Sequence, residues 1–564
     1  MKAISPGLLI RTLRHLRAGQ LAAQVGVRLN PSWRDPSWVA RRRPPDPPAI
    51  RWRPVIDWLL PDPQTNAAVD LAAGRFTFVN DTRQIGWPPD WSVADAPLLW
   101  RYNLHYLEWA WALSRDEAVS AAADWSQRHV PVRDAVGWSP YPTSLRLPSL
   151  CLLAASSGKT HGELWESIWR QAEHLSRRLE YHLLGNHLLE NAIALAFVGS
   201  CFDGPDSRRW HATGLRLLRD QIAEQILPDG MHFERSPMYQ TRLTYALALL
   251  VNTGNAEVAA VASQPLARMM AALAAVCHPD GQIALFNDSA FGIYHDPGKV
   301  VAYAAAVLGS APVGRPSALP HAGYYRGDNG RGDAVICDAG LLGPDYVPGH
   351  AHGDIFSFEL SFGGRRVVVD SGTYDYVASD MRRYCRSTAA HNTVTIDGED
   401  QAEFWAAFRV GRRGRPHDVI HREQADGFTL EGWHDGYRHL PAAAIHRRRF
   451  VWNDAGTLGI RDAIDARRPV HAASRLHLHP DCHVLEVTGA SVRAACGDVP
   501  FTVAFSGGGA VRLEEGWYCP QFGVRHRNTV IVHDAKGSDI SLDCLIARGD
   551  TPGASHGEIG RAHV

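Results

Sequence analysis

The chain has 564 residues, of which 45% are hydrophobic and 21% are charged, and its net charge is -1. This length predicts two large domains and not one small one. Near-neutral charge argues against binding to nucleic acid or to a membrane surface through bulk charge, so any anionic substrate has to be held by a local cluster.

The cysteines and the N-terminus bear on the compartment. Nine cysteines, an odd number, are scattered without a CxxC pair and predict reduced core thiols. The stretch MKAISPGLLIRTLRHLRAGQLAAQV mixes basic with apolar residues and lacks the apolar core of a signal peptide. No window approaches the length of a membrane span. We therefore expect a cytoplasmic protein, and a start codon placed after an export signal would make it periplasmic or secreted.

Two segments precede the strands. Residues 1–95 begin with a basic helix and continue into RRRPPDPPAIRWRP, whose prolines exclude regular helix, so we expect an arm or strap on the main body. Residues 96–315 show helix patterns of roughly 15 to 20 residues between short Gly, Pro and Asp breaks. Amphipathic helices without intervening strands predict helical hairpins packed into a ring or bundle.

The last part of the chain, residues 320–564, has a strand pattern. Short strands alternate with turns such as NDAG and SGGG, and the helix period is absent. Many short strands at regular spacing predict an antiparallel β-sandwich. The expected fold is thus a multidomain α+β protein with helices first and strands second.

The clearest hairpin signal lies in Gly349 to Tyr376, GHAHGDIFSFELSFGGRRVVVDSGTYDY. From Phe356 to Phe362 apolar and polar residues alternate, which is the period of a half-buried strand, and the following Gly-Gly is a turn signal. A two-residue loop would set Leu360 opposite Val367. It would leave Asp370 on the exposed face, near the histidines that precede the strand.

The first candidate site is the sequence GNHLLEN at 185–191. The glycine breaks one helix, so Asn186 starts the next, where free backbone N–H groups favour an anion. His187, Glu190 and Asn191 share one face of that helix because of their spacing. The alternative is that Asn186 is only an N-cap and His187 a surface group.

A second candidate is the polar segment PDGMHFERSPMYQ at 228–240, between two helices. It places Glu234 and Tyr239 on either side of a proline. A tyrosine near a helix start is more commonly a residue at the edge of the core, so this segment gains meaning only together with others.

A third candidate is a set of histidines and carboxylates in the strand half. Imidazole nitrogen together with carboxylate oxygen suits a zinc-like ion. No compact motif such as HExxH is present, and a hydrogen-bonded polar patch at a domain interface explains the same residues. The set comprises His350, His352, Asp354, Asp370 and His391.

Two aromatic-rich stretches, WRYNLHY at 100–106 and WSPYPTSLR at 138–146, form a fourth candidate. Aromatic rings pack against sugar faces and arginine binds a carboxylate with two N–H groups, so Asn103, His105 and Arg146 are candidate substrate-binding residues. The alternative is a group of core aromatics with one ion pair.

Taken together, these motifs resemble those of the heparinase II/III-like polysaccharide lyases. The matching pieces are NHLLEN, DGMHFERSPMY and GHAHGD...VVVDSGTYDY...AHNTV, in the family's order and approximate spacing. The resemblance implies an incomplete (α/α) toroid followed by an antiparallel β-sandwich. It also implies cleavage of uronic-acid polysaccharides by β-elimination.

The resemblance assigns roles to residues of this chain. Asn186 and His187 resemble the pair that neutralises the substrate carboxylate and takes part in catalysis. Tyr239 resembles the catalytic tyrosine, and His350 the histidine that the sandwich contributes. Glu190 occupies a position that some members use for substrate contact.

The resemblance also implies a structural divalent metal, usually zinc in the family. His352, Asp370 and His391 resemble its ligands, and Tyr384 and Arg386 resemble residues that reach the substrate.

The leading hypothesis is a lyase for an anionic, uronate-containing polysaccharide of a type that the sequence does not specify. One alternative is a glycoside hydrolase on the same helical ring, for which Glu190 and Glu234 are the available carboxylate pair. Another alternative is a non-catalytic protein that binds polysaccharide or assists its assembly.

Overall fold

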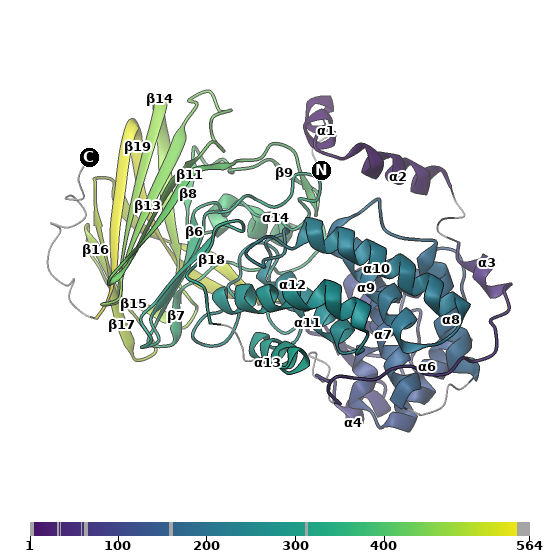
Figure 1. Cartoon of the computed structure of the whole chain (residues 1–564). Coiled ribbons are helices and arrows are strands. Elements are labelled where there is room, and N and C mark those ends of the chain that lie inside the picture. The colour runs from purple at the N-terminus through teal and green to yellow at the C-terminus, as the bar shows by residue number, and fades with distance from the viewer. Residues whose placement is uncertain are drawn as a thin grey trace.

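The computed structural model describes residues 5–30, 33, 35–57, 59–60, 66–156, 162–310 and 314–549. An N-terminal arm with α1 (Pro6–Leu13), α2 (Ala18–Leu29), α3 (Ser37–Ala40) and α4 (Ala68–Ala72) precedes a small hairpin of β1 (Arg75–Phe78) and β2 (Asp81–Gln84). A ring of helices follows, and the strand half lies beside it (Figure 1).

The helical half has an inner and an outer layer. The inner helices α7, α9 and α11 are buried on nearly every side, whereas α8, α10 and α12 bury one face and expose the other. Inner and outer helices pack in pairs, α7 with α8, α9 with α10 and α11 with α12. This arrangement is an incomplete (α/α) toroid. Its helices are α5 (Leu98–Tyr106), α6 (Arg115–Arg128), α7 (Pro140–Ser156), α8 (Gly162–Ser176), α9 (Gly185–Cys201), α10 (Pro205–Gln225), α11 (Pro237–Val251), α12 (Ala256–Ala275) and α13 (Pro297–Leu308).

Among the described residues only α12 is long and apolar enough to cross a membrane by length and composition. It packs against α11 and α13, and half of its most apolar window is buried inside the protein. A buried helix of a ring needs the same apolar composition as a membrane span.

The strand half consists of two antiparallel sheets that pack face to face. The smaller sheet has the order β3-β4-β5-β6-β7, and the larger contains the path β11-β12-β13-β14-β19-β17-β16-β15, with β18 paired to β19 and β8 to β14. Their strands are β3 (Ala318–Leu319), β4 (Tyr324–Asp328), β5 (Ala334–Asp338), β6 (Ser357–Phe362), β7 (Arg365–Val368), β8 (Val394–Ile396), β11 (Pro416–Gln424), β12 (Gly427–His434), β13 (Ile445–Asn453), β14 (Thr457–His477), β15 (Cys482–Val487), β16 (Ser491–Cys496), β17 (Val499–Ser506), β18 (Ala510–Gln521) and β19 (Val524–Arg548). The predicted toroid and β-sandwich are therefore confirmed.

The strand β6 pairs with β7 as the sequence predicts at the turn, but not beyond it. Phe362 pairs with Arg365 across the Gly-Gly loop, and a bulge then sets Leu360 opposite Val368. The prediction that Leu360 lies opposite Val367 was wrong by one residue, because a bulge inserts an extra residue into one strand.

Both faces of β6 are buried. Phe358 and Leu360 pack in the core between the two sheets, whereas Glu359 and Ser361 face the toroid. There His278, which follows α12, lies 2.8 Å from both Ser361 Oγ and Glu359 Oε2. The expectation of an exposed face carrying Asp370 was wrong, because the toroid covers that face.

Between the sheets' strands the chain forms α14 (Asp380–Arg386) and a short hairpin of β9 (Phe404–Trp405) and β10 (Arg409–Val410). In Figure 1 α14 lies between the sandwich and the helices of the toroid. The loop before β6, α14 and the first turns of α9 and α11 meet at this interface through the hydrogen bonds described below.

Candidate active site

Asn186 lies in the first turn of α9, and its amide meets a buried carboxylate. Its backbone N–H and its side-chain Nδ2 donate to Glu234 Oε1, at 2.8 and 3.1 Å. Gly185 precedes it with φ +56°, and a Cβ at that position would lie 2.3 Å from Glu234 Oε1. Only glycine combines this backbone conformation with the close approach of a carboxylate, so the GN pair of the motif has a structural reason.

His350, in the loop before β6, lies between two carboxylates. Its Nδ1 is 2.8 Å from Asp288 Oδ2, and its Nε2 is 3.3 Å from Glu234 Oε2. An imidazole donates from both nitrogens only when it carries two protons. Both ring nitrogens of His350 face carboxylate oxygens, and Glu234 joins His350 to Asn186.

Tyr239, in the first turn of α11, packs against His350 with ring centroids 4.2 Å apart. Its hydroxyl lies 3.2 Å from that of Tyr376. Burial raises the pKa of Tyr239 well above its ordinary value, and neighbouring Tyr376 and Tyr294 add to the effect. The phenol is therefore held in its protonated form, which is a proton donor.

His187 is the most solvent-accessible of the four candidate catalytic residues, with 30% of its side chain exposed. Its Nδ1 lies 3.0 Å from Glu180 Oε1, and its ring packs on Tyr141 at 4.3 Å. Burial lowers the pKa of His187, but Glu180 outweighs burial and the net shift is upward. The hydrogen bond of this ring within the described part of the chain is made by Nδ1 and not by Nε2.

Asp288 organises the interface, and sequence analysis missed it. Besides His350, it accepts from Arg382 Nη2 at 2.9 Å and lies 2.9 Å from His352 Nε2. The arginine holds the pKa of Asp288 well below its usual value, against the effect of burial. The sequence signal that could have identified Asp288 is the NDS triplet within the apolar stretch IALFNDSAF. A carboxylate in such a stretch is expected to be buried and therefore needs a partner.

His352, Asp370 and His391 form a buried group whose ligand atoms lie within 4.8 Å of one another. His391 Nδ1 is 2.7 Å from Asp370 Oδ2, and His352 Nε2 is bound to Asp288. The other ring nitrogens, His352 Nδ1 and His391 Nε2, are buried without a hydrogen-bond partner. Two unpartnered imidazole nitrogens beside a carboxylate fit a divalent metal site.

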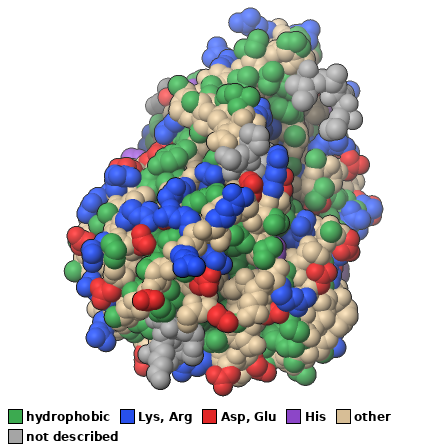
Figure 2. All heavy atoms as spheres, turned by 90° about the vertical axis from the view of Figure 1, so that its right-hand side faces the viewer, with side chains coloured by type: hydrophobic (Ala, Val, Ile, Leu, Met, Phe, Trp, Pro, Cys, Tyr) green, Lys and Arg blue, Asp and Glu red, His purple; other side chains and the backbone are tan. Residues whose placement is uncertain are grey.

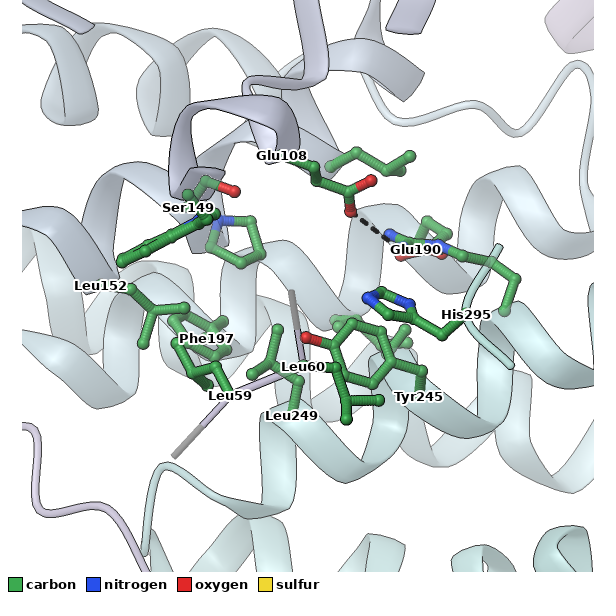
Figure 3. A pocket seen from close by; sticks show the side chains of 16 residues that line it. Leu59, Leu60, Glu108, Ser149, Leu152, Glu190, Phe197, Tyr245, Leu249 and His295 are labelled. Atoms are coloured by element: carbon green, nitrogen blue, oxygen red, sulfur yellow. Dashed lines mark hydrogen bonds and ion pairs between the residues drawn. The ribbon is translucent and has the colours of Figure 1, made fainter. Parts of the chain in front are cut away.

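Glu190, a predicted substrate contact, lies one turn along α9 from Asn186 and is paired with Arg242 at 2.9 Å. Arg242 also binds Glu108 at 2.9 Å, so two carboxylates surround one guanidinium. These three residues line a cavity of about 210 Å³ inside the ring, with apolar walls that include Leu60 and Phe197 (Figure 3).

The two aromatic-rich stretches lie in the toroid core. Arg146 is fully buried, donates to the carbonyl oxygens of His105 and Gly137, and stacks on Trp125 at 3.8 Å. His105 is also fully buried and accepts from Trp125 Nε1, while the buried Asn103 donates to the carbonyl oxygen one turn earlier. This arrangement matches the core aromatics of the alternative interpretation, because none of these side chains faces solvent. The ion pair of that interpretation is not formed among the described residues, since Arg146 donates to Gln171 Oε1 and to carbonyl oxygens.

The two predicted contacts on α14 behave differently from each other. The Tyr384 hydroxyl accepts from Trp517 N–H at 2.9 Å and is partly exposed. Arg386 is buried, donates to the carbonyl oxygens of Ala351 and Ala407, and stacks on Phe404. Arg386 thus holds the loop before β6, whereas the neighbouring Arg382 contacts the charged cluster.

A toroid joined to a β-sandwich, with histidine, tyrosine and asparagine gathered where the two meet, defines a two-domain class of protein. Comparison with known families agrees with it. The model described as "Heparinase II/III N-terminus" matches residues 156–296, and the model described as "Heparinase II/III-like, C-terminal" matches residues 311–552. Together they cover more than half of the chain, which belongs to the heparinase II/III-like family.

Individual relatives carry different names. The chain is 28% identical to a heparin-sulfate lyase of Pedobacter heparinus over 62% of its own length. That match spans 58% of the lyase, which is less than two thirds of its length. The chain is also 25% identical to the FtsZ-localized protein C of Caulobacter vibrioides, over 73% of this chain and 75% of that protein.

The fold has a close counterpart among solved structures. A crystal structure of heparinase III superposes with a TM-score of 0.69 and 17% identity, over 97% of this chain and 94% of that one. At this identity the likeness establishes the arrangement of toroid and sandwich.

Proposed function

We propose that the protein is a polysaccharide lyase that cleaves a uronic-acid-containing anionic polysaccharide by β-elimination and leaves an unsaturated uronate end. The observation that carries the proposal is the meeting of Asn186 and His350 at Glu234, with Tyr239 packed on His350 and the partly exposed His187 beside Asn186. The similarity to a heparin-sulfate lyase supports an anionic polymer as substrate.

The first requirement of this reaction is stabilisation of the substrate carboxylate. The C5 proton of a uronate is weakly acidic, so negative charge that develops on the carboxylate has to be met by donors. The Asn186 amide and the His350 ring are such donors, and in the free protein Glu234 satisfies both. We infer that the substrate carboxylate competes with Glu234 for them.

The second requirement is a base, for which His187, His350 and Tyr239 are the candidates. We favour His187, since Glu180 binds its Nδ1 and leaves Nε2 with the lone pair of the neutral ring. His350 faces carboxylates on both sides, and Tyr239 is held as a neutral phenol. His187 then takes the C5 proton while the C4–C5 double bond forms and the C4–O bond breaks.

The third requirement is a proton for the departing glycosidic oxygen. Tyr239 is the proposed donor, because burial keeps its hydroxyl protonated. Tyr376, 3.2 Å from that hydroxyl, positions it.

We further propose zinc as the ion that His352, Asp370 and His391 would hold. Neutral imidazole nitrogen with carboxylate oxygen is a common zinc ligand set. When bound, the ion would fix the loop before β6 relative to the segment after β7 that carries Asp370, and it would supply no bond-breaking step.

The hydrolase alternative needs two carboxylates facing one sugar. Glu190 is bound to Arg242, and Glu234 is bound to Asn186 and His350, so each carboxylate already has strong partners. A non-catalytic role has one observation in its favour, the similarity to a protein named for its FtsZ localisation. We therefore keep it as the second candidate.

The deciding experiment is incubation of the purified chain with glycosaminoglycans, alginates and bacterial exopolysaccharides. A lyase releases a product that absorbs in the ultraviolet through its new double bond. Release of reducing ends without that absorbance would support a hydrolase. Binding of polymer without turnover, unchanged in Asn186→Ala and Tyr239→Phe variants, would support the non-catalytic role.

A further inference from the structure

The N-terminal arm differs in charge from the chain as a whole. Residues 1–34 contain six Lys or Arg and no Asp or Glu, although the net charge of all 564 residues is -1. The overall neutrality that argues against a charged partner therefore conceals one strongly basic segment.

The helix α1 turns an apolar stripe to solvent. Pro6, Leu9, Ile10 and Leu13 follow one another at the i, i+3, i+4 and i+7 positions, which is one face of a helix. All four are exposed, and Ile10 is 66% exposed. The buried residue of this helix is polar, namely Thr12.

The helix α2 repeats the arrangement. Ala22, Val25, Gly26 and Leu29 have the same spacing and are all exposed, with Leu29 at 78%. Its buried residue is Gln20. An ordinary surface helix buries its apolar face, so both helices have the opposite orientation.

Polar contacts hold the arm in this orientation. Thr12 Oγ1 accepts from Trp405 Nε1 at 3.1 Å, and Gln20 Nε2 donates to the carbonyl oxygen of Tyr346 at 3.1 Å. Arg11 binds Glu403 beside β9, on the sandwich side.

Arg17 extends the same attachment to the toroid. It binds Glu224 of α10 at 2.5 Å and stacks on the ring of Tyr346 at 3.7 Å. The polar side of the arm thus faces the body, and its apolar side is directed away from both halves of the protein.

Two arginines border the apolar stripes without a neutralising partner. Arg14 follows α1 and Arg28 lies in the last turn of α2, and both are exposed. Neither forms an ion pair with the residues that the structure describes. At the top of Figure 2, where α1 and α2 lie in Figure 1, hydrophobic and basic side chains lie next to each other.

We propose that α1 and α2 bind the surface of a membrane that contains anionic lipids. Exposed apolar stripes on short helices, bordered by basic and no acidic residues, have the composition of helices that lie in the plane of the lipid headgroups. The basic residues are attracted to anionic headgroups, and the leucine, isoleucine and valine side chains reach the acyl boundary. The helix α12 takes no part, because it is packed in the toroid.

The test is sedimentation of the full chain with phosphatidylcholine vesicles, with and without phosphatidylglycerol. We expect the protein to pellet with the phosphatidylglycerol vesicles only, and binding to weaken as salt is added. The triple change Leu9→Ser, Ile10→Ser, Leu13→Ser should weaken binding by about tenfold or more.

Matched variants distinguish binding by this surface from nonspecific binding through any exposed apolar side chain. The exposed Val130 and Val132 lie in a loop of the toroid, so Val130→Ser with Val132→Ser should bind as the wild type does.

A second pair of variants tests the contribution of the basic residues of the arm to vesicle binding. Arg14→Gln with Arg28→Gln should weaken binding, whereas Arg467→Gln with Arg468→Gln, at exposed positions of the sandwich, should not.

Three results would overturn the proposal. The first is failure to pellet with either vesicle, and the second is equal binding by the wild type and the triple variant. The third is a triple variant that differs from the wild type only in the sedimentation coefficient of the free protein, which would indicate pairing of two copies through the arm. Lyase activity is measured on the same variants, so absence of turnover with intact vesicle binding would reject the proposed function and leave this one standing.

Discussion

The two faces of β6 are equally buried and chemically opposite. Phe358 and Leu360 fill the space between the two sheets with hydrocarbon, whereas Glu359 on the other face meets His278 and Arg366. The candidate active site and the metal group lie on the polar side. Burial alone therefore does not separate structural from functional residues in this fold, and the hydrogen-bonding partners do. Substitutions on the two sides should have different effects.

The largest effect is expected at Tyr239. Tyr239→Phe removes the proposed proton donor and should lower kcat/KM by about 1,000-fold, within the usual range for a general acid. Tyr376→Phe removes only the neighbouring hydroxyl and should cost about tenfold or less. Ultraviolet detection of the unsaturated product measures both. Equal losses in the two variants would contradict the assignment.

On the apolar face, Phe358→Ala should act on stability alone. Truncating a fully buried phenylalanine costs about 3 to 5 kcal/mol of unfolding free energy, which urea denaturation measures. Below the unfolding transition kcat/KM should stay within about twofold of the wild type. A large loss of activity in the folded variant would show that the two faces are not independent.

Metal content tests the buried histidine group. His391→Ala removes one of two imidazole ligands and should reduce bound metal, read by elemental analysis, by about 10-fold or more. His278→Asn changes a histidine on the same buried face that binds Ser361 and Glu359, and it should retain the metal. Equal metal content in both variants would contradict the assignment of His391 as a metal ligand.

The smallest effect concerns pH. The proposed base acts only when His187 is neutral, so kcat/KM falls as pH falls through its pKa, which Glu180 raises. Glu180→Gln lowers this pKa and should move the acidic limb of the pH profile to lower pH. Glu257→Gln changes a carboxylate bound to another histidine, His211, and should leave the limb in place. An unmoved limb in Glu180→Gln would assign the base to another group.

The sequence predicted those features that depend on local pattern. The helix and strand periods identify toroid and sandwich, and the motifs identify Asn186, Tyr239 and His350, which the structure brings together. The bulge in β6 was not predictable, since register depends on the partner strand as well as on the alternation. Asp288 was missed because its partners lie between 62 and 94 residues away.

Two further differences between the sequence-based expectation and the structure have one physical cause. His105 and Arg146 have the composition of a sugar-binding site, yet their hydrogen bonds are satisfied inside the toroid. Leu29 and Ile10 are apolar residues of the type that normally packs in a core, yet they are exposed. In both cases residue type indicates a preference for polar or apolar surroundings and does not specify which neighbour supplies them.

Asp288 also limits how the two halves of the protein can move. It belongs to the segment between α12 and α13, and it holds His350, His352 and Arg382, all of which lie after β5 in the strand half. A hinge motion that separated the halves would break these contacts together and leave a buried carboxylate without partners, at a cost of about 3 to 5 kcal/mol. We therefore expect a polymer chain to enter beside the partly exposed His187 while the two domains keep a fixed relative orientation.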